Sequence, residues 1–140
     1  MYTFFKKLWK FVKKIKRSAI MKFGAFESLS TEEFIKRQGE GFHIIDIRRA
    51  DEWEQTGVIE GSHKITFFDE FAQYDVDAFL EAFTKIVKNK QEPFILVCAH
   101  ANRTKSIAEL LALKLKYENV YELDGGINYG WIDKGYETVK

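Results

Sequence analysis

Apolar residues recur along residues 28–135 in two alternating patterns, which predict an alternation of strands and helices. Short runs rich in β-branched residues are typical of buried strands, whereas apolar residues spaced three and four positions apart are typical of helices. The expected strands cover residues 42–47, 63–67, 93–99 and 119–125. The expected helices cover residues 28–38, 49–57, 75–89, 104–116 and 127–135. Repeated alternation with short connections favours an α/β domain with a mainly parallel sheet.

Local signals support several of these elements. Ser30 followed by Glu33 forms a capping-box pattern, which predicts that a helix begins after Ser30. Gly57 is placed to end the second helix. Residues 93–97 contain almost no polar side chain, as expected for a parallel strand that is covered on both faces.

The first 17 residues follow a different pattern, that of an amphipathic helix. At about 100° per residue, one half of the helical wheel is apolar and aromatic, and the other half is cationic. The apolar half comprises Phe4, Phe5, Leu8, Trp9, Phe11, Val12 and Ile15. This composition is typical of a helix that lies in a membrane interface. We therefore predict a basic amphipathic arm, residues 1–22, joined to a domain of residues 23–140, with an anionic membrane surface as a partner of residues 1–20.

The arm has other interpretations. Its apolar face can dock on the protein's own body or on a partner protein, and Met21 can be the true start of the chain. A secretory signal is disfavoured because lysines interrupt every apolar run. No stretch approaches the ~18 apolar residues of a membrane span. The sequence leaves the choice among membrane, partner and body open.

Charge divides the chain in the same place. The whole chain carries 22 Lys/Arg and 21 Asp/Glu. Residues 1–22 hold eight of the basic residues and no acidic one, which leaves 14 basic and 21 acidic residues, a net charge of −7, in residues 23–140. The chain is thus a basic arm on an acidic body, and we expect no nucleic-acid partner.

Composition bounds the class of protein. The 46% apolar and 31% charged residues are ordinary for a globular domain. The single cysteine, Cys98, excludes an internal disulfide framework and a cysteine-rich metal site. An unpaired thiol suits a reducing compartment, so we expect a cytoplasmic protein, or one peripheral at the inner face of a membrane. His43 and His63 show no ligand spacing, so neither a metal nor another cofactor is expected.

Cys98 occupies a position at which parallel sheets bind ligands. It follows the apolar residues 93–97 and precedes a helical pattern. Asp46 and Asp124 also follow the apolar parts of expected strands. Ligands bind at the carboxyl ends of the strands in open parallel sheets, so these three side chains are predicted to converge on one edge.

The segment after Cys98 predicts an anion-binding loop. A strand-loop-helix turn can wrap backbone N–H groups around the sulfur, and the helix adds its positive N-terminal end. Both effects favour the thiolate over the thiol. Short side chains permit close approach of the backbone, Arg103 supplies a fixed cation, and His100 a weaker one. The predicted loop comprises Ala99, His100, Ala101, Asn102, Arg103 and Thr104.

Three motifs follow one another along residues 28–135. The first is an apolar strand leading into Asp-x-Arg and an acidic-aromatic turn, the second is Cys with four variable residues before Arg, and the third is a Gly-Gly pair with a nearby Trp. The residues that carry them are Asp46, Arg48, Glu52, Trp53, Gly57, Ile59, Gly61, Cys98, Arg103, Gly125, Gly126 and Trp131. In their order and spacing the motifs resemble the rhodanese-like domain family. The chain departs from the family pattern at Val58, Glu60, Ser62 and Thr104.

The resemblance implies a fold and a chemistry. The fold is a five-stranded parallel sheet between helices. In the implied sulfurtransfer, Cys98 attacks a sulfane sulfur donor such as thiosulfate, becomes a persulfide, and passes the outer sulfur to a thiol or cyanide acceptor. The acceptor must come from outside because the chain has no second cysteine.

The resemblance also implies supporting roles for residues around the loop. Arg103 is expected to brace the loop against Asp46 or Glu52, or else to bind substrate. Arg48 is expected either to be solvated or to rim the pocket. The remaining supporting residues are Gly125 and Gly126, which would shape the pocket from a turn.

Loop length separates two chemistries. Four residues lie between Cys98 and Arg103, whereas phosphatases of similar architecture have five. The shorter loop favours sulfur over phosphate. A membrane-recruited persulfide carrier that serves a partner protein and a non-catalytic rhodanese-like binding module remain alternatives to the enzyme.

Overall fold

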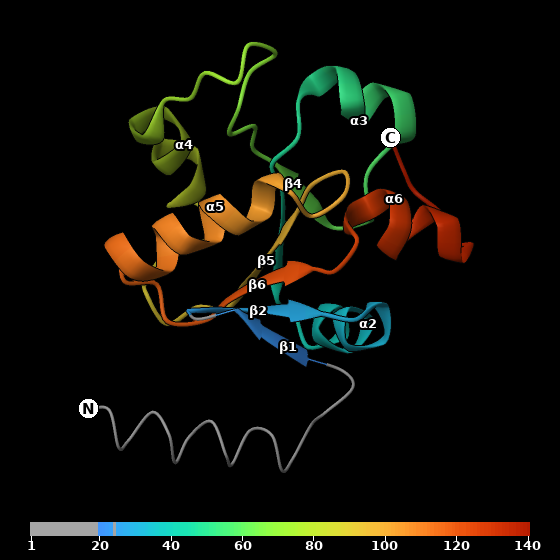
Figure 1. Ribbon diagram of the computed structural model, residues 1–140, viewed down its shortest axis with the longest axis horizontal. Helices are drawn as coiled ribbons and strands as arrows, with labels where there is room; N and C mark the ends of the chain where they lie inside the picture. The colour runs from blue at the N-terminus through green and yellow to red at the C-terminus, as the bar shows by residue number, and fades with distance from the viewer. Residues whose placement is uncertain (1–19, 24) are drawn as a thin grey trace.

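A six-stranded sheet forms the centre of the molecule in the computed structural model, which describes residues 20–23 and 25–140 (Figure 1). The order of strands across the sheet is β1-β2-β6-β5-β3-β4. The strands are β1 (Ile20–Phe23), β2 (Phe26–Leu29), β3 (His43–Asp46), β4 (Ser62–Lys64), β5 (Phe94–Val97) and β6 (Val120–Leu123). The amphipathic helix predicted for the arm lies outside the described residues.

Five of the strands are parallel, which confirms the predicted mainly parallel sheet. The sixth, β1, pairs antiparallel with β2 at the edge and was not predicted. The hydrophobic pattern also missed β2 and assigned its last two residues to a helix. The predicted arm, residues 1–22, overlaps β1, and the helix predicted over residues 28–38 overlaps β2, so neither segment was interpreted as a strand.

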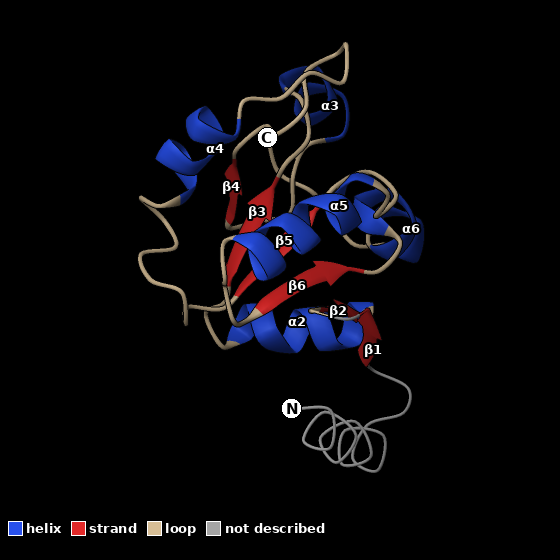
Figure 2. Ribbon diagram, turned by 60° about the vertical axis from the view of Figure 1, so that its left-hand side comes forward, coloured by secondary structure: helices blue, strands red, loops and turns tan. Residues whose placement is uncertain are grey.

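Helices cover both faces of the sheet, and β5 contributes to the core on each side (Figure 2). Phe94 and Leu96 pack in the core beneath α4 and α5, whereas Ile95 and Val97 pack in the core beneath α2 and α6. All four side chains are buried, as predicted for a strand covered on both faces. The helices are α2 (Thr31–Gly39), α3 (Ala50–Thr56), α4 (Val76–Phe83), α5 (Arg103–Glu109) and α6 (Gly126–Gly130).

The ends of the helices follow local chemistry. The Ser30 hydroxyl accepts a hydrogen bond from the backbone N–H of Glu33, so α2 begins where the capping pattern predicted. Gly57 ends α3 with a positive φ of 75°. The helix expected over 75–89 is shorter, because α4 ends at Phe83. Val87 is nevertheless buried in the core. Its apolar spacing therefore correctly indicated a buried side chain but not a helical backbone.

The helix after β5 changes its winding. It continues from α5 into a wider π-helical segment, η1 (Leu110–Lys114). The last helical element of the chain is a short 3₁₀ turn, η2 (Ile132–Lys134). The apolar spacing over 104–116 therefore predicted the extent of this helix but not its change of pitch.

The aromatic core beneath α4 generates a stability prediction. Phe83 is fully buried and its ring meets the rings of Phe79, Phe94 and Tyr117. Phe83→Ala should lower the free energy of unfolding by about 3–5 kcal/mol in urea denaturation, because it removes these contacts and leaves a cavity. The matched change Phe71→Ala, at a ring that is 74% exposed, should alter it by less than about 0.5 kcal/mol. Equal losses in the two variants would contradict the assignment of this core.

Candidate active site

Cys98 follows directly after β5 at the carboxyl edge of the parallel sheet. It is buried, with 1% of its surface exposed. Asp46 ends the neighbouring strand β3 and lies beside Val97 in the register. Asp124 follows β6, the neighbour on the other side. The ends of these strands therefore meet at one edge as the sequence predicted, and Cys98 lies in the middle because β5 stands between β6 and β3.

The loop after Cys98 leaves several backbone donors without internal partners. Within the described part of the chain, no hydrogen-bond acceptor is found for the N–H groups of Ala99, His100, Ala101 and Asn102. Ala101 is buried and has a positive φ of 63°, a left-handed conformation that costs a non-glycine residue about 1–2 kcal/mol. The fold thus holds a strained loop whose N–H groups are available to an anion.

Helix α6 fixes the start of this loop. The backbone N–H groups of Ile127 and Asn128 donate to the carbonyl oxygens of Cys98 and Ala99, at 2.8 and 3.0 Å. Gly126 makes this approach feasible, because a Cβ atom there would lie 2.4 Å from the Ala99 oxygen. Both carbonyls therefore point toward α6. Gly126 therefore contributes to the geometry of the loop, whereas Gly125 contacts Tyr129 and Gly130 within its own segment.

Arg103 forms the first of two ion pairs at the site. Its two terminal nitrogens each lie 2.8 Å from one carboxylate oxygen of Glu52 in α3. The hydrogen bond with Glu52 raises the pKa of Arg103 despite partial burial. Burial alone would raise the pKa of Glu52, but donation from Arg103 and from the Arg49 backbone lowers it. Of the two partners expected for Arg103, the structure selects Glu52.

Asp46 belongs to the second ion pair, with Arg48. The Arg48 guanidinium is 1% exposed and donates to both carboxylate oxygens of Asp46, to Thr56 Oγ1 and to the Gly57 carbonyl. Trp53 Nε1 also donates to Asp46, at 3.0 Å. Arg48 is therefore neither solvated nor at the rim of a pocket, contrary to both expectations. Asp46 already has a buried cation, which explains why Arg103 turns to Glu52.

Thr104 connects Cys98 to residues that the sequence analysis missed. Its Oγ1 lies 3.7 Å from Cys98 Sγ and 2.7 Å from Glu122 Oε1. Lys105 Nζ binds the same carboxylate at 2.7 and 3.1 Å. The available signal was weak: Glu122 is the single charged residue in the otherwise uncharged strand Val120–Leu123.

His100 lies at the outer edge of the loop, where it contacts two residues of α6, Asn128 and Tyr129. His100 is exposed, and its Nε2 lies 3.1 Å from Asn128 Nδ2. Its ring also contacts Tyr129, with 4.6 Å between ring centroids. Trp131 lies in the core beside Phe34 instead of at this edge. His100 is therefore placed to meet a ligand that approaches the loop from solvent.

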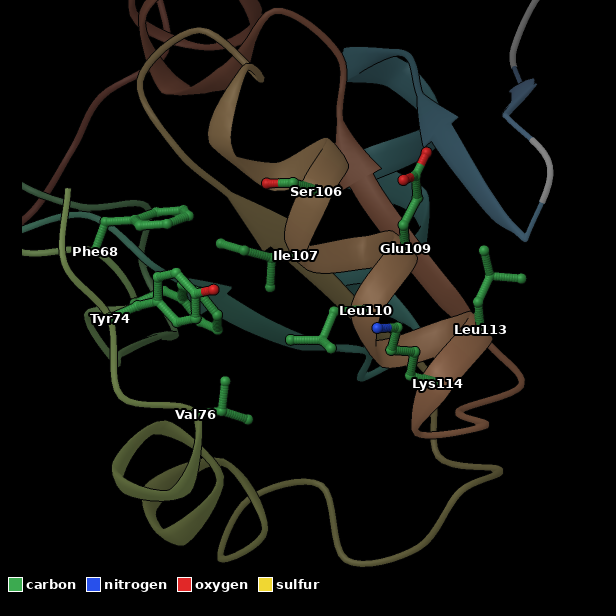
Figure 3. Close-up of a pocket in the computed structure, with 10 residues that line it drawn as sticks. Phe68, Tyr74, Val76, Ser106, Ile107, Glu109, Leu110, Leu113 and Lys114 are labelled. Carbon is green, nitrogen blue, oxygen red and sulfur yellow. The ribbon is translucent and has the colours of Figure 1, made fainter.

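Two neighbouring hollows lie along this side of the protein. One, of about 410 Å³, is lined by Asn102, Arg103 and Ser106 together with Arg49 and Phe68. The other, of about 460 Å³, lies between α5 and the segment before α4 and is mainly apolar; Phe68 and Ser106 line it too. Figure 3 shows its aromatic wall facing α5. The first hollow borders the loop that follows Cys98.

Two negative findings apply to the part of the chain that the structure describes. It contains no group of three or more His, Cys, Asp or Glu side chains arranged to hold a metal ion. In the same residues, no helix has the length and apolar character needed to cross a membrane.

A comparison with protein families decides what this domain is. Residues 30–133 match the model of the rhodanese-like domain. The chain belongs to the rhodanese-like domain family. A rhodanese domain-containing protein of Drosophila melanogaster is 34% identical over 94 residues, which cover 66% of this chain and 83% of that protein. The recognition made from the three motifs is therefore confirmed.

Solved structures with the rhodanese fold resemble most of the chain. A rhodanese-related protein from Thermoplasma volcanium superimposes with a TM-score of 0.60 at 21% identity, covering 80% of this chain and 96% of that chain. A rhodanese-like domain protein from Staphylococcus aureus gives a TM-score of 0.56 at 22% identity, covering 81% and 98%. At these identities the likeness supports the fold alone, and the roles of single residues rest on the geometry of this chain.

The two ion pairs generate a prediction about Arg103. Arg103→Ala should lower the free energy of unfolding at pH 7 by about 1.5–3 kcal/mol, because it leaves Glu52 partly buried without its charged donor. Arg49→Ala is the comparison variant, since the Arg49 guanidinium pairs mainly with the exposed Asp51 and lies 3.8 Å from Glu52, and it should lower the free energy of unfolding much less.

The pH dependence of this difference follows from Glu52. The pKa of Glu52 is lowered in the folded state, so the pair stabilises the protein above the unfolded pKa of about 4.3 and loses its effect as the pH falls through the lower folded value. Urea titrations at pH 7, 5 and 3 should show the gap between wild type and Arg103→Ala closing toward pH 3. A gap of equal size at pH 3 would show that the loss does not come from this pair.

Proposed function

We propose that this rhodanese-like domain is a sulfurtransferase that works through a persulfide on Cys98. One observation carries the proposal: the buried sulfur of Cys98 begins a loop whose N–H groups at residues 99–102 lack internal partners. Such a loop can accept the negative outer sulfur of a persulfide. Burial of Cys98 supports it further, because it shields the intermediate from water.

The reaction divides into two displacements. First, the Cys98 thiolate attacks the outer sulfur of thiosulfate; a new S–S bond forms to Cys98, the old S–S bond breaks, and sulfite leaves with the electron pair. Second, cyanide or a thiolate attacks the outer sulfur of the persulfide. A bond from the acceptor to sulfur forms, the bond to Cys98 breaks, and the Cys98 thiolate is regenerated. No oxidant or reductant is consumed.

The surrounding charges support a sulfane donor. Arg103 is fixed by Glu52 and lines the hollow beside the loop, next to Asn102, so a cation lies at the loop end of a hollow whose lining also includes Arg49, Asp69 and Glu70. Four residues separate Cys98 from Arg103, which favours sulfur over the larger phosphate group. The acceptor is external, because Cys98 is the only cysteine of the chain.

A kinetic experiment tests the enzyme. The full chain should form thiocyanate from thiosulfate and cyanide with double-displacement kinetics, and Cys98→Ser should reduce the rate at least about a hundredfold, since a serine hydroxyl forms no persulfide. Thermal melting should be nearly unchanged, because the substitution keeps the size of the side chain. Full activity in Cys98→Ser would eliminate this mechanism. A folded wild type inactive with several sulfane donors would favour the non-catalytic binding module.

We also propose that residues 1–20 bring this domain to an anionic membrane surface on the cytoplasmic side. The proposal rests on their sequence, in which aromatic and aliphatic residues share one face of a helical wheel and lysines the other. Each lysine near such a surface contributes roughly 1 kcal/mol of attraction. The acidic body, with a net charge of −7 over residues 23–140, would be repelled and would face away.

Vesicle binding tests the arm. Full chain should sediment with vesicles containing phosphatidylserine, less at higher salt, whereas the double substitution Leu8→Asp and Phe11→Asp should abolish binding. The matched control Leu113→Asp with Phe71→Asp introduces the same charges at exposed positions of the body and should bind like wild type. Equal binding by all three chains, or by none, would contradict a role for the arm at membranes. A loss of solubility in the arm variant would favour docking on the body.

A further inference from the structure

The buried carboxylate of Glu122 lies close to Cys98 and is connected to it through Thr104. Glu122 is fully buried in β6, where it pairs in register with Leu96 of β5, two residues before Cys98. Its carboxylate accepts hydrogen bonds from the Thr104 hydroxyl and from Lys105 Nζ. Burying a carboxylate is costly unless charged or polar donors satisfy it. These two residues of α5 therefore supply the donors that the buried carboxylate needs.

The hydroxyl of Thr104 is shared between Glu122 and Cys98. It has a single proton, and the short 2.7 Å contact to a carboxylate is a charge-assisted hydrogen bond that takes this proton. The lone pairs of Oγ1 are then left for Cys98 Sγ, 3.7 Å away. A lone pair can accept from a thiol S–H but offers nothing to a thiolate. As long as the Thr104 hydroxyl donates its proton to Glu122, the contact between Thr104 Oγ1 and Cys98 Sγ stabilises the thiol form of Cys98.

The other charged groups near Cys98 have partners of their own, although the positive charge of Arg103 still acts on the Cys98 sulfur. Around the site, Arg103 of α5 is paired with Glu52 of α3, and Asp46 of β3 is paired with Arg48. His100 in the loop is exposed. Glu122 is balanced by Lys105, but Lys105 is 43% exposed whereas Glu122 is fully buried. Water screens the lysine more than the carboxylate, so Lys105 offsets the charge of Glu122 only in part, and Thr104 connects this carboxylate to the sulfur.

We propose that Glu122 is a positioning residue that sets the protonation state of Cys98 through Thr104. In the resting site Glu122 orients the hydroxyl so that Cys98 is held as the thiol. When Cys98 loses its proton to solvent, the Thr104 hydroxyl turns its proton to the sulfur, and Lys105 remains as the donor to Glu122. Cys98 is therefore kept in its less reactive thiol form at rest, and rotation of the Thr104 hydroxyl stabilises the reactive thiolate. This inference rests on the proposed role of Cys98 as the nucleophile.

Alkylation of Cys98 by iodoacetamide measures this directly, because the reagent is uncharged and reacts with the thiolate of the only cysteine. In the full chain, Glu122→Gln should move the midpoint of the rate-against-pH curve down by about 0.5–1 pH unit, roughly three- to tenfold more thiolate below the midpoint. Lys105→Met should move the midpoint up. A midpoint that stays or rises in Glu122→Gln would overturn the proposal.

A double substitution tests whether the effect passes through Thr104. In a Thr104→Val background, Glu122→Gln should shift the midpoint by less than half of its effect in the wild-type background. An undiminished shift would show that Glu122 acts through space and would overturn the role of the hydroxyl. If Glu122→Gln fails to fold, the half-exposed Lys105 still provides the test, and an unchanged or lower midpoint in Lys105→Met overturns the proposal. Alkylation needs no sulfur donor, so a missing sulfurtransferase activity would count against the proposed function and not against this device.

Discussion

Two backbone hydrogen bonds between α6 and the loop after β5 determine the geometry of the whole site. They join Ile127 and Asn128 to the carbonyl oxygens of Cys98 and Ala99, and they form only because Gly126 has no Cβ atom. With both carbonyls turned toward α6, the N–H groups of the loop are left for a ligand. The strain of Ala101 is tolerated because the two ends of the loop are held by α6 and α5.

Three groups of ionic contacts surround this loop, and each has a different role. Asp46 and Arg48 form a fully buried pair that joins β3 to the end of α3, and Glu52 fixes Arg103 at the mouth of the loop. Glu122, Lys105 and Thr104 form a third group behind the sulfur. Under the proposed function, the first pair is structural, the second holds Arg103 where an anionic donor would approach, and the third lies behind the Cys98 sulfur. In the proposed enzyme, stability and reactivity therefore depend on different charges.

The sequence predicted the parts of this arrangement that depend on short-range patterns. Cys98 at the end of an apolar strand and the family motifs were sufficient to predict the fold and to single out the loop. The family resemblance limited the partner of Arg103 to Asp46 or Glu52 but could not decide between them, because the choice depends on Arg48 pairing with Asp46 in the folded protein. Glu122 was missed because a single charged residue in a short strand is normally interpreted as a residue that faces solvent, whereas Glu122 is buried. β1 and β2 were missed because the pattern of the basic arm extends into β1 and the capping pattern at Ser30 assigned the end of β2 to a helix.

Intact-mass measurement of the full chain after exposure to thiosulfate tests the persulfide most directly. The account predicts a gain of one sulfur atom per chain, located by peptide mapping on Cys98, which persists after the donor is removed and disappears when cyanide is added. A chain that remains unmodified by thiosulfate and by other sulfane donors, while Cys98 still reacts with iodoacetamide, would contradict it.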